Sequence, residues 1–578
     1  MALRRGTGLV LALIGLAVVV SAAGLVFSAL LVGGGPTVRQ GSTLVLRLGD
    51  LAEVEPLGLF SSWLPSRPTV RATIDAIRRA KTDSRIKGLL VVPAGGATLW
   101  GKVQEVRDAV LDFRTSGKPA VAFLEFGGEQ EYYVATACDR IFLLPTSPLD
   151  VRGLATYEVF FRGTLDKIGT YPDLVHIGDY KTAINTFTET GFTPAHREMA
   201  ESLNGDLFSQ LVDGIAARRS KSSDEVRALV DEGPFLPEDA LRAGLIDDLA
   251  YRDEASRAAR LAIDGDRAIS LDDYARTGTT SGFGRADRIA IIYIVGMITS
   301  GRSGRATEGE FSGSDTISEY VRRAREDARV KAIVVRIDSP GGSSVASDVI
   351  WHELTLARAK KPVVVSMSDL AASGGYYVAL PAHVIVAQPA TLTGSIGIYA
   401  GKFVTGGTFE KLGARVDGVS AGRMADMNSP ARPYSDAERA KLVEQLQAFY
   451  DGFVEKVAQA RRSTPEQIDA IAQGRVWTGR QARDLGLVDE LGGLERAIAI
   501  ARERAKIPST AKVEIVVYPP KRSWYELVAD PFSSVRTAIV SQILPRPEER
   551  AVARSLTSTL HLFRRGEPLA LMPNVFVR

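Results

Sequence analysis

The chain carries one block of sequence twice, and this duplication constrains its fold more than any other feature. The run Tyr-Tyr-Val-Ala at 132–135 recurs at 376–379, an offset of 244 residues. Further matches keep the same order along the chain: 85–87 with 329–331, Pro145 with Pro389, Gly153 with Gly397, and 244–249 with 486–491 at an offset of 242. Matches in one order with small gaps indicate a duplicated domain. We therefore expect repeats over residues 43–269 and 288–518.

The sequence outside the repeats contains a linker and a C-terminal extension. Residues 277–286 are rich in Gly, Ser and Thr, which predicts a linker within 270–287. Residues 519–578 have no counterpart in the first repeat, and no role is predicted for them. Of the 578 residues, 45% are hydrophobic and 24% are charged, so the repeats can bury ordinary cores.

Each repeat alternates short apolar runs with amphipathic stretches. In the second repeat the apolar runs predict strands, and apolar residues at helical spacing predict helices. The expected strands cover 289–295, 332–337, 362–366 and 384–386, and the expected helices cover 315–327, 347–359 and 373–380. This alternation indicates an α/β fold with mostly parallel sheets and right-handed crossovers.

The N-terminus predicts a single membrane anchor. Arg4 and Arg5 precede residues 8–32, which hold no charged side chain, and a helix needs about 20 residues to cross the hydrocarbon core. The positive-inside rule then places residues 1–7 in the cytoplasm and the body of the protein on the periplasmic side of the inner membrane. A cleavable signal peptide is one alternative, with small residues at 21–23 as its cleavage site. A buried core helix is another, which the length of the apolar run disfavours.

Charge and cysteine content exclude several classes of function. Lys and Arg number 71 and Asp and Glu 68, so the net charge of +3 lacks the basic excess of a dedicated nucleic-acid binder. Cys138 is the only cysteine, which excludes an intrachain disulfide and a cysteine-based zinc site. The five histidines are scattered and form no HExxH motif. We therefore do not expect a zinc hydrolase, and the mechanism considered below requires neither a metal ion nor an organic cofactor.

A first glycine-rich turn, Asp-Ser-Pro-Gly-Gly, lies at 338–342, where an expected strand ends and a helix begins. Glycines there allow backbone N–H groups to point into a cleft, as an oxyanion site requires. The alternative is an ordinary turn that needs Gly and Pro for its backbone geometry.

A second glycine-rich turn surrounds Ser373, in the run Ala-Ala-Ser-Gly-Gly-Tyr-Tyr. Small neighbours leave the hydroxyl accessible, and the start of a helix favours a developing oxyanion. The alternative is a serine that only caps the helix. In the first repeat Glu129 takes the place of Ser373, although the neighbouring Tyr-Tyr-Val-Ala is kept. Because a cap would be useful in both copies, this difference favours a role that only the second copy performs.

A nucleophilic serine needs a base. His383 follows Ser373 along the chain, but no constellation of histidine and carboxylate emerges, and the counterpart of His383 is Asp139. Lys181 stands in the run Gly-Asp-Tyr-Lys-Thr-Ala, and its counterpart is Ala425. The copy with the serine therefore lacks the lysine, and the copy with the lysine lacks the serine. A solvated surface lysine is the alternative, but this complementarity favours a serine–lysine pair.

These motifs, together with Thr-Gly-Ser-Ile-Gly at 393–397, resemble the signal peptide peptidases of the SppA type in their long, tandem-domain bacterial form. The resemblance covers residues 1–510. It implies a membrane-anchored Ser–Lys endopeptidase, similar in fold to Clp protease and crotonase and assembled as a homotetramer, that degrades cleaved signal peptides and similar apolar peptides. At the matching positions it implies these roles: Ser373 as nucleophile, Lys181 as general base, Ser395 as the serine that orients the lysine amine, and Gly341, Gly374 and the neighbouring Gly342 as oxyanion donors.

The implied mechanism needs a lysine with a lowered pKa. Free lysine has a pKa of about 10.4 and is protonated at neutral pH, whereas burial disfavours the ammonium and lowers the pKa. One departure from the family pattern is Asp179, two residues before Lys181. We expect its negative charge to oppose this effect and raise the pKa of the lysine.

Two other functions fit parts of the sequence. A catalytically inactive membrane scaffold with a protease-like fold would not need both Ser373 and Lys181. A crotonase-type acyl-CoA enzyme also uses glycine-rich oxyanion loops. It does not explain the division of serine and lysine between the repeats, or the predicted anchor.

Overall fold

The computed structural model of the chain describes residues 37–54, 68–96, 98–262, 265–277, 286–306, 309–508, 510–520 and 568–572, with the isolated positions 15 and 19. Apart from those two positions, the predicted anchor over 8–32 lies outside the described residues, as do residues 278–285 of the predicted linker. Within the described ranges, no helix has both the length and the apolar character needed to cross a membrane.

The first repeat is built on a six-stranded sheet in which all neighbours run parallel, in the order β6-β4-β3-β2-β1-β7. Its strands are β1 (Ser42–Leu48), β2 (Ile86–Pro93), β3 (Ala120–Leu124), β4 (Arg140–Leu143), β6 (Asp248–Leu249) and β7 (Ala268–Ser270). Leu44 packs under helices α2 (Val70–Thr82) and α3 (Trp100–Arg114), whereas Val45 faces α10 (Arg252–Ala259). Both faces of the sheet are therefore buried, as is usual for parallel strands.

The second repeat has an eight-stranded sheet that is parallel except where β16 meets β18. Its strands are β8 (Asp287–Val295), β12 (Val330–Ser339), β14 (Val363–Ala372), β15 (Val384–Ala387), β16 (Leu392–Gly394), β18 (Val476–Thr478), β19 (Glu490–Leu491) and β20 (Val513–Tyr518). The predicted α/β fold with mostly parallel sheets is confirmed.

Several elements of the second repeat differ in extent from the expectation, and two of them are α13 and β14. Helix α13 (Ser344–Arg358) begins before the expected residue 347, because the hydroxyl of Ser343 accepts a hydrogen bond from the N–H of Ala346 and caps the helix there. Strand β14 continues beyond the expected residue 366 to Ala372, because its last residues pair with β16. The extra length brings β14 up to Ser373.

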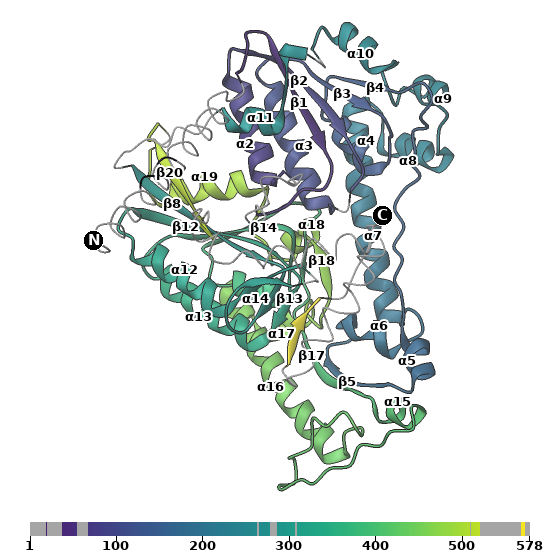
Figure 1. Cartoon of the computed structure of the whole chain (residues 1–578), viewed down its shortest axis with the longest axis vertical. Coiled ribbons are helices and arrows are strands. Elements are labelled where there is room, and N and C mark those ends of the chain that lie inside the picture. The colour runs from purple at the N-terminus through teal and green to yellow at the C-terminus, as the bar shows by residue number, and fades with distance from the viewer. Residues whose placement is uncertain are drawn as a thin grey trace, which may run out of the picture.

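A third sheet joins the two repeats, in the order β10-β11-β9-β13-β21-β17-β5. Its strands are β5 (Tyr171–Ile177), β9 (Met297–Thr299), β10 (Gly304–Ala306), β11 (Gly309–Gly313), β13 (Gly341–Ser343), β17 (Ile398–Val404) and β21 (Leu569–Leu571). β5 of the first repeat pairs with β17 of the second along its whole length. β21, drawn in yellow in Figure 1, belongs to the C-terminal extension and lies between β13 and β17.

Two long helices also connect the repeats. α7 (Pro194–Arg219) and α16 (Asp436–Arg461) have 26 residues each and are equivalent in the duplication. α7 of the first repeat packs on β18 of the second, and α16 packs on β5 (Figure 1). The remaining helices are α4 (Glu129–Ala135), α5 (Arg162–Ile168), η1 (Thr182–Ile184), α6 (Asn185–Thr188), α8 (Ser223–Glu232), α9 (Pro237–Arg242), η2 (Gly265–Arg267), α11 (Leu271–Arg276), α12 (Ser314–Glu326), α14 (Gly374–Ala379), α15 (Gly406–Lys411), α17 (Pro465–Asp469), α18 (Gly479–Asp484) and α19 (Leu494–Arg504).

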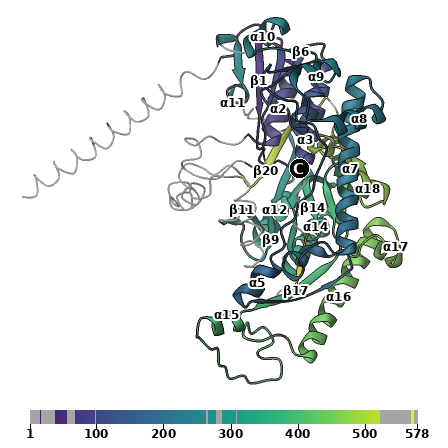
Figure 2. The same ribbon diagram turned by 90° about the vertical axis from the view of Figure 1, so that its right-hand side faces the viewer.

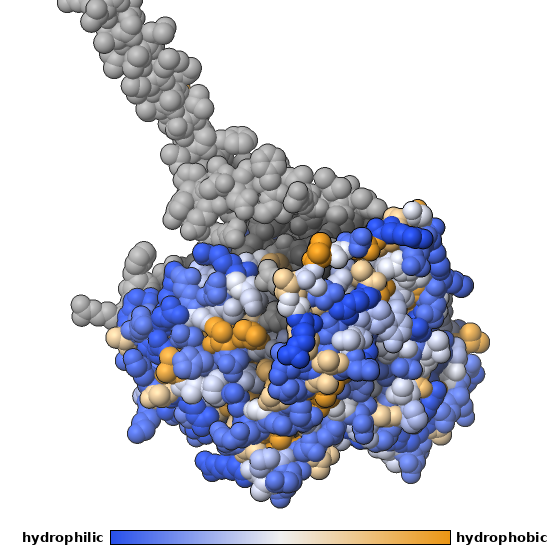
Figure 3. All heavy atoms as spheres, turned by 90° about the horizontal axis from the view of Figure 1, so that it is seen from below, coloured by the Kyte–Doolittle hydropathy of each residue, from blue (hydrophilic) through white to orange (hydrophobic). Residues whose placement is uncertain are grey.

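Seen from below, the outer surface is largely hydrophilic, with apolar side chains in small groups (Figure 3). The loop between α15 and α16 projects at the lower end of the molecule in Figure 2 and carries several exposed apolar side chains, among them Leu412 and Val419. Many of the buried apolar side chains lie in the cores of the two repeats and in a smaller cluster beside β17.

Candidate active site

Ser373 lies where β14 ends and α14 begins. Its backbone has φ 54° and ψ −113°, a conformation that residues other than glycine rarely adopt. Its N–H donates to the carbonyl of Gly394, and its own carbonyl accepts from the N–H of Tyr377, both at 2.8 Å. The side chain makes no capping hydrogen bond, so helix capping does not account for a serine here. A sharp turn between a strand and a helix is also how other hydrolases present a serine.

Lys181 reaches Ser373 from the first repeat. It follows β5 after a short turn and immediately precedes η1. Its Nζ lies 2.8 Å from Oγ of Ser373, and both residues are fully buried. The structure therefore brings together the two residues that the comparison of the repeats singled out.

The environment of Lys181 favours a neutral amine. Burial lowers the pKa of Lys181 well below its ordinary value of 10.5. The expectation that Asp179 raises this pKa is wrong. Asp179 is exposed, so water screens its charge, and the desolvation of the lysine dominates.

Ser395 completes the surroundings of the amine. Its carbonyl oxygen and its Oγ each lie 2.9 Å from Nζ of Lys181. Glycines leave room for the stem of the lysine. A Cβ on Gly397 would lie 3.1 Å from Cδ of Lys181, and one on Gly474 would lie 2.5 Å from its Cα. Gly397 belongs to a motif noted in the sequence, whereas Gly474 is a contact that sequence analysis missed.

The three glycines predicted as oxyanion donors lie together beside Ser373. Gly341 and Gly342 have φ of 105° and 151°, values that favour glycine. A Cβ on Gly341 would lie 2.7 Å from the backbone nitrogen of Gly374, so the two glycine-rich turns touch. The N–H of Gly341 donates to Oγ of Ser339 at 3.1 Å, whereas Gly342 pairs with β21.

The strand that lies against these glycines was missed by the sequence analysis. The carbonyl oxygen of Ala570 in β21 is the nearest atom to a Cβ built on Gly341, and it is 3.2 Å from one built on Gly374. The run Leu-Ala-Leu-Met at 569–572, between two prolines, is the feature that could have marked a strand in the C-terminal extension.

Comparison with known protein families identifies the family of this chain. The model of Peptidase family S49 matches residues 112–264 and 355–508, which include Lys181 and Ser373. The chain belongs to peptidase family S49. Its membership sets aside the acyl-CoA alternative and makes it a serine-type peptidase.

Relatives of this S49 peptidase cover most of its length. It is 36% identical over 496 residues to Protease 4 of Salmonella typhi, across 82% of this chain and 78% of the relative. It is 35% identical over 487 residues to the chloroplastic serine protease SPPA of Arabidopsis thaliana, across 83% and 71%. Among solved structures, ClpP1 from Listeria monocytogenes aligns with 35% of this chain and 91% of its own length, at 17% identity and a TM-score of 0.23. Likeness to Clp protease and crotonase stays a prediction.

Buried charges lie under the first glycine-rich turn of the S49 peptidase and join its repeats. Nζ of Lys102, at the start of α3, lies 2.6 Å from Asp338 and 2.9 Å from Asp369. Burial opposes the charge of Lys102, but the two carboxylates outweigh it and raise the pKa of the lysine. Burial raises the pKa of Asp338 to about 6. Lys102 therefore ties the end of β12, from which the turn begins, to the first repeat.

A second buried cluster lies beside the first. The guanidinium of Arg336 in β12 is 2.9 Å from Glu53 and 2.6 Å from Glu105, and all three side chains are almost completely buried. The carboxylates belong to the first repeat and the arginine to the second. The interface between the repeats is therefore held by buried ion pairs as well as by the shared sheet.

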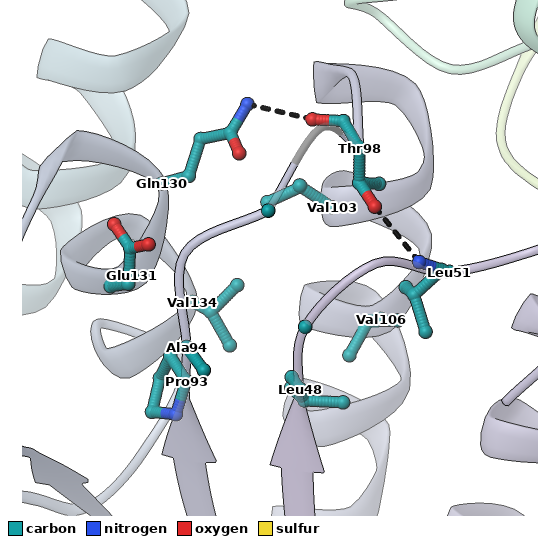
Figure 4. A pocket seen from close by; sticks show the side chains of 12 residues that line it. Leu48, Leu51, Pro93, Ala94, Thr98, Val103, Val106, Gln130, Glu131 and Val134 are labelled. Carbon is teal, nitrogen blue, oxygen red and sulfur yellow. Dashed lines mark hydrogen bonds between the residues drawn. The ribbon is translucent and has the colours of Figure 1, made fainter. Parts of the chain in front are cut away.

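The equivalent place in the first repeat is a cavity whose lining contains neither serine nor lysine (Figure 4). Gln130 and Glu131 lie in the first turn of α4, and their counterparts Gly374 and Gly375 open α14. The amide of Gln130 donates to the carbonyl of Thr98 at 3.1 Å, and burial raises the pKa of Glu131. This cavity therefore has no counterpart of the Ser373–Lys181 pair.

His383 takes no part in the candidate site. Its Nδ1 accepts a hydrogen bond from the N–H of Val363 at 3.1 Å, and burial lowers its pKa. Among the described residues, no group of three or more His, Cys, Asp or Glu side chains could hold a metal ion.

Proposed function

We propose that the chain is a serine endopeptidase in which Ser373 is the nucleophile and Lys181 the general base. One observation carries the proposal: Nζ of Lys181 lies 2.8 Å from Oγ of Ser373, and both groups are buried. Burying a lysine and straining the backbone of a serine both cost folding free energy. A chain that keeps a buried lysine and a strained serine despite these costs is better explained as an enzyme than as an inactive scaffold.

The oxygens around Lys181 assign the hydrogens of its amine. A neutral amine has two N–H groups and one lone pair. Ser395 offers two oxygens at 2.9 Å, of which the carbonyl can only accept. When both N–H groups are donated to Ser395, the lone pair faces Ser373, whose hydroxyl can then donate its proton to Nζ. Ser395 orients the base in this way.

The proposed reaction proceeds through an acyl-enzyme. Oγ of Ser373 attacks the carbonyl carbon of a peptide while Nζ of Lys181 takes the hydroxyl proton. The ammonium then gives this proton to the leaving amine as the C–N bond breaks. Water hydrolyses the ester that remains, with Lys181 again as base. Backbone N–H groups of Gly374 and of the 341–342 turn would stabilise the oxyanion.

We propose cleaved signal peptides and similar apolar peptides as substrates, met at the periplasmic face of the inner membrane. The uncharged segment at 8–32, which predicts a membrane anchor, supports this. A chain lacking residues 1–40 should then leave the membrane and remain active. The resemblance suggests a homotetramer, in which eight repeats form a ring and complete sites alternate with sites that lack the pair.

The test compares the unmodified protein with Ser373→Ala and Ser318→Ala. Ser318 is buried in α12, and its hydroxyl has no hydrogen-bond partner among the described residues, so it is a matched control. A fluorophosphonate probe should label Ser373 in the unmodified protein and in Ser318→Ala, and hydrolysis of an apolar fluorogenic peptide should follow the labelling. Labelling and turnover that persist in Ser373→Ala would show that Ser373 is not the nucleophile.

A further inference from the structure

A buried lysine that the proposed reaction does not use contacts both strands that lead to the glycine-rich turns. Lys102 stands in the first turn of α3, and its side chain is 9% exposed. Its Nζ lies 2.6 Å from Asp338 at the end of β12 and 2.9 Å from Asp369 in β14. Its backbone N–H also donates to Asp369, at 2.8 Å. One residue of the first repeat is thus bonded to two strands of the second.

The comparison of the repeats sets this cluster of charges apart. At the offset of 244 residues, the counterpart of Lys102 is Ala346 in α13. The first repeat has Ala94 in place of Asp338, and it has the exposed Glu125 in place of the second aspartate. The copy with the two aspartates therefore lacks the lysine. The serine and the lysine of the candidate site are divided between the copies in the same way.

β14 contains a bulge at the level of this cluster. Between two paired positions, β12 has the single residue Asp338, whereas β14 has residues 368–370. Pairing resumes with Ser339 opposite Ala371, and Ser373 follows two residues later. Bulges bend a strand and redirect the side chains near an active site. The conformation of residues 368–370 therefore determines where the nucleophile stands relative to β12.

Polar contacts of the cluster hold this bulge. A bulge leaves some backbone and side-chain groups without their usual partners in the sheet. Here the N–H of Leu370 donates to the carboxylate of Asp338 at 3.2 Å. The carboxylate of Asp369 accepts from the ammonium and the N–H of Lys102 and from the N–H of Leu99, the last at 3.2 Å. Without the ammonium, the two carboxylates would face each other with no cation between them.

The start of α3 also packs directly against the bulge (Figure 1). A Cβ built on Gly101 would lie 3.0 Å from the carbonyl oxygen of Ser368 and 3.2 Å from Cα of Asp369. A larger residue at position 101 would therefore push α3 away from β14. The counterpart of Gly101 in the second repeat is Val345, which is exposed. Only the copy that contacts the bulge has a glycine at this position.

The two glycine-rich turns meet where the strands pair again after the bulge. The N–H of Gly341 donates to Oγ of Ser339 at 3.1 Å. The carbonyl oxygen of Ser339 lies 2.8 Å from a Cβ built on Gly375. Gly375 belongs to the turn of Ser373, and Gly341 belongs to the turn of the expected oxyanion donors. The pairing of Ser339 with Ala371 therefore sets the position of the nucleophile relative to those donors.

We propose that Lys102 is a positioning residue of the peptidase, which holds the bulge of β14 and so aligns Ser373 with the oxyanion donors. The inference rests on the proposed function of Ser373 and Lys181. The alignment matters in the transition state, because the oxyanion forms only as Oγ attacks. A misplacement of about 1 Å can cost about 100-fold in rate. Lys102 therefore acts on kcat rather than on KM, and catalysis in the second repeat depends on a residue of the first.

The test measures kcat and KM of the full chain for an apolar fluorogenic peptide. Lys102→Met removes the ammonium and keeps a side chain of similar length, so kcat should fall about 10- to 100-fold with little change in KM. Gly101→Ala keeps every charge but displaces α3, so kcat should fall about threefold to tenfold. Arg325→Met is the control. It breaks a comparably shielded ion pair with Glu353, between α12 and α13, and should keep kcat.

A peptide aldehyde separates alignment from loss of folded protein. A smaller folded fraction lowers the apparent kcat, but it leaves the inhibition constant of the folded molecules unchanged. The adduct of the aldehyde with Oγ of Ser373 places the former carbonyl oxygen at the oxyanion donors. Its inhibition constant should therefore rise in Lys102→Met by about the factor by which kcat falls. An unchanged inhibition constant would overturn the positioning role and leave Ser373-dependent hydrolysis intact.

Amide hydrogen exchange tests the bulge without turnover. Exchange over residues 368–373 should be about tenfold faster in Lys102→Met than in the unmodified protein, and unchanged in Arg325→Met. If the unmodified protein hydrolyses no peptide but this difference is found, the proposed function fails and the hold of Lys102 on the bulge stands. Equal exchange in the three proteins would overturn that hold. If Lys102→Met does not fold, Lys102→Met with Asp338→Asn, which removes one of the unpaired carboxylates, repeats each measurement beside Gly101→Ala.

Discussion

Nζ of Lys181 lies 2.8 Å from Oγ of Ser373 across 192 residues of sequence, because a strand of the first repeat is paired into the second. The end of β5 at Ile177 lies opposite Ile398 at the start of β17, close to Ser395 in the sequence. The turn after β5 then leads directly to Lys181. Each repeat therefore supplies half of one site, and the duplication alone would not have required this.

Ser373→Ala should abolish peptide hydrolysis without unfolding the protein. We expect kcat/KM to fall by about 10³-fold or more, as for other serine nucleophiles. The change removes one hydroxyl and its contact with Lys181, so the free energy of unfolding should change by about 1 kcal/mol or less. Turnover and thermal unfolding are measured on the same preparation, beside Ser318→Ala. Normal turnover by the purified Ser373→Ala variant would contradict the assignment of Ser373 as the nucleophile.

Activity should fall as the pH is lowered, because Lys181 acts as a neutral amine. Burial lowers its pKa well below 10.5. Above the lowered pKa the amine can accept the proton of Ser373, and below it the ammonium cannot. The acid limb of kcat/KM against pH should therefore follow a single ionisation. A profile that stays flat down to a pH at which the fold is lost would contradict a lysine base.

The same pKa shift links stability to pH. Between the lowered pKa and the ordinary value of 10.5, the unfolded chain binds more protons than the folded chain, so the free energy of unfolding rises with pH. Lys181→Met removes this linkage. At neutral pH Lys181→Met should be more stable than the unmodified protein, and this difference should shrink as the pH rises toward 10.5. Denaturant unfolding of both proteins at pH 7 and pH 9 gives the change of the free energy of unfolding with pH for each. An equal change in the two proteins would count against a buried neutral lysine.

The pair at the centre of the site was accessible from the sequence because a duplicated chain provides its own comparison. Glu129 stands in place of Ser373 beside the shared Tyr-Tyr-Val-Ala, and Ala425 stands in place of Lys181. The parallel α/β sheets followed from the spacing of the apolar runs. The differences between the two copies and the spacing of the apolar runs can both be seen in a single sequence.

The exchange of elements between the repeats could not be predicted. β5 and β17 have the composition of ordinary strands, and the partner of a strand is chosen by contacts distant in sequence. β21 has three residues and forms only because it has a neighbour on each side. The error about Asp179 has a similar origin, because proximity to Lys181 in sequence does not reveal that its carboxylate faces water.

Arg336→Met should destabilise the protein by about 3–5 kcal/mol, because it leaves Glu53 and Glu105 buried without their cation. Arg322→Met is the control. Its side chain is 50% exposed where it pairs with Glu353, so its loss should cost about 1 kcal/mol or less. Denaturant midpoints of the two variants give the comparison. Equal shifts would mean that the buried pairs contribute no more than a surface pair.

A lysine at position 425 should not replace Lys181. Ala425 is the counterpart of Lys181 in the duplication, but it is exposed in the loop between α15 and α16 (Figure 2), whereas Ser373 is fully buried. In the proposed ring, Ala425 would face Glu129 of the partner subunit, where a new ammonium would pair with that carboxylate.

Ala425→Lys in a Lys181→Ala background should therefore show only the residual activity of Lys181→Ala. The control is Ala425→Lys alone, which should keep full activity because it leaves the 2.8 Å pair of Lys181 and Ser373 untouched. Peptide hydrolysis by the three variants is compared at one pH. Substantial recovery in the double variant would mean that a lysine of the second repeat can reach the serine of its own repeat. The division of the site between the repeats would then be wrong.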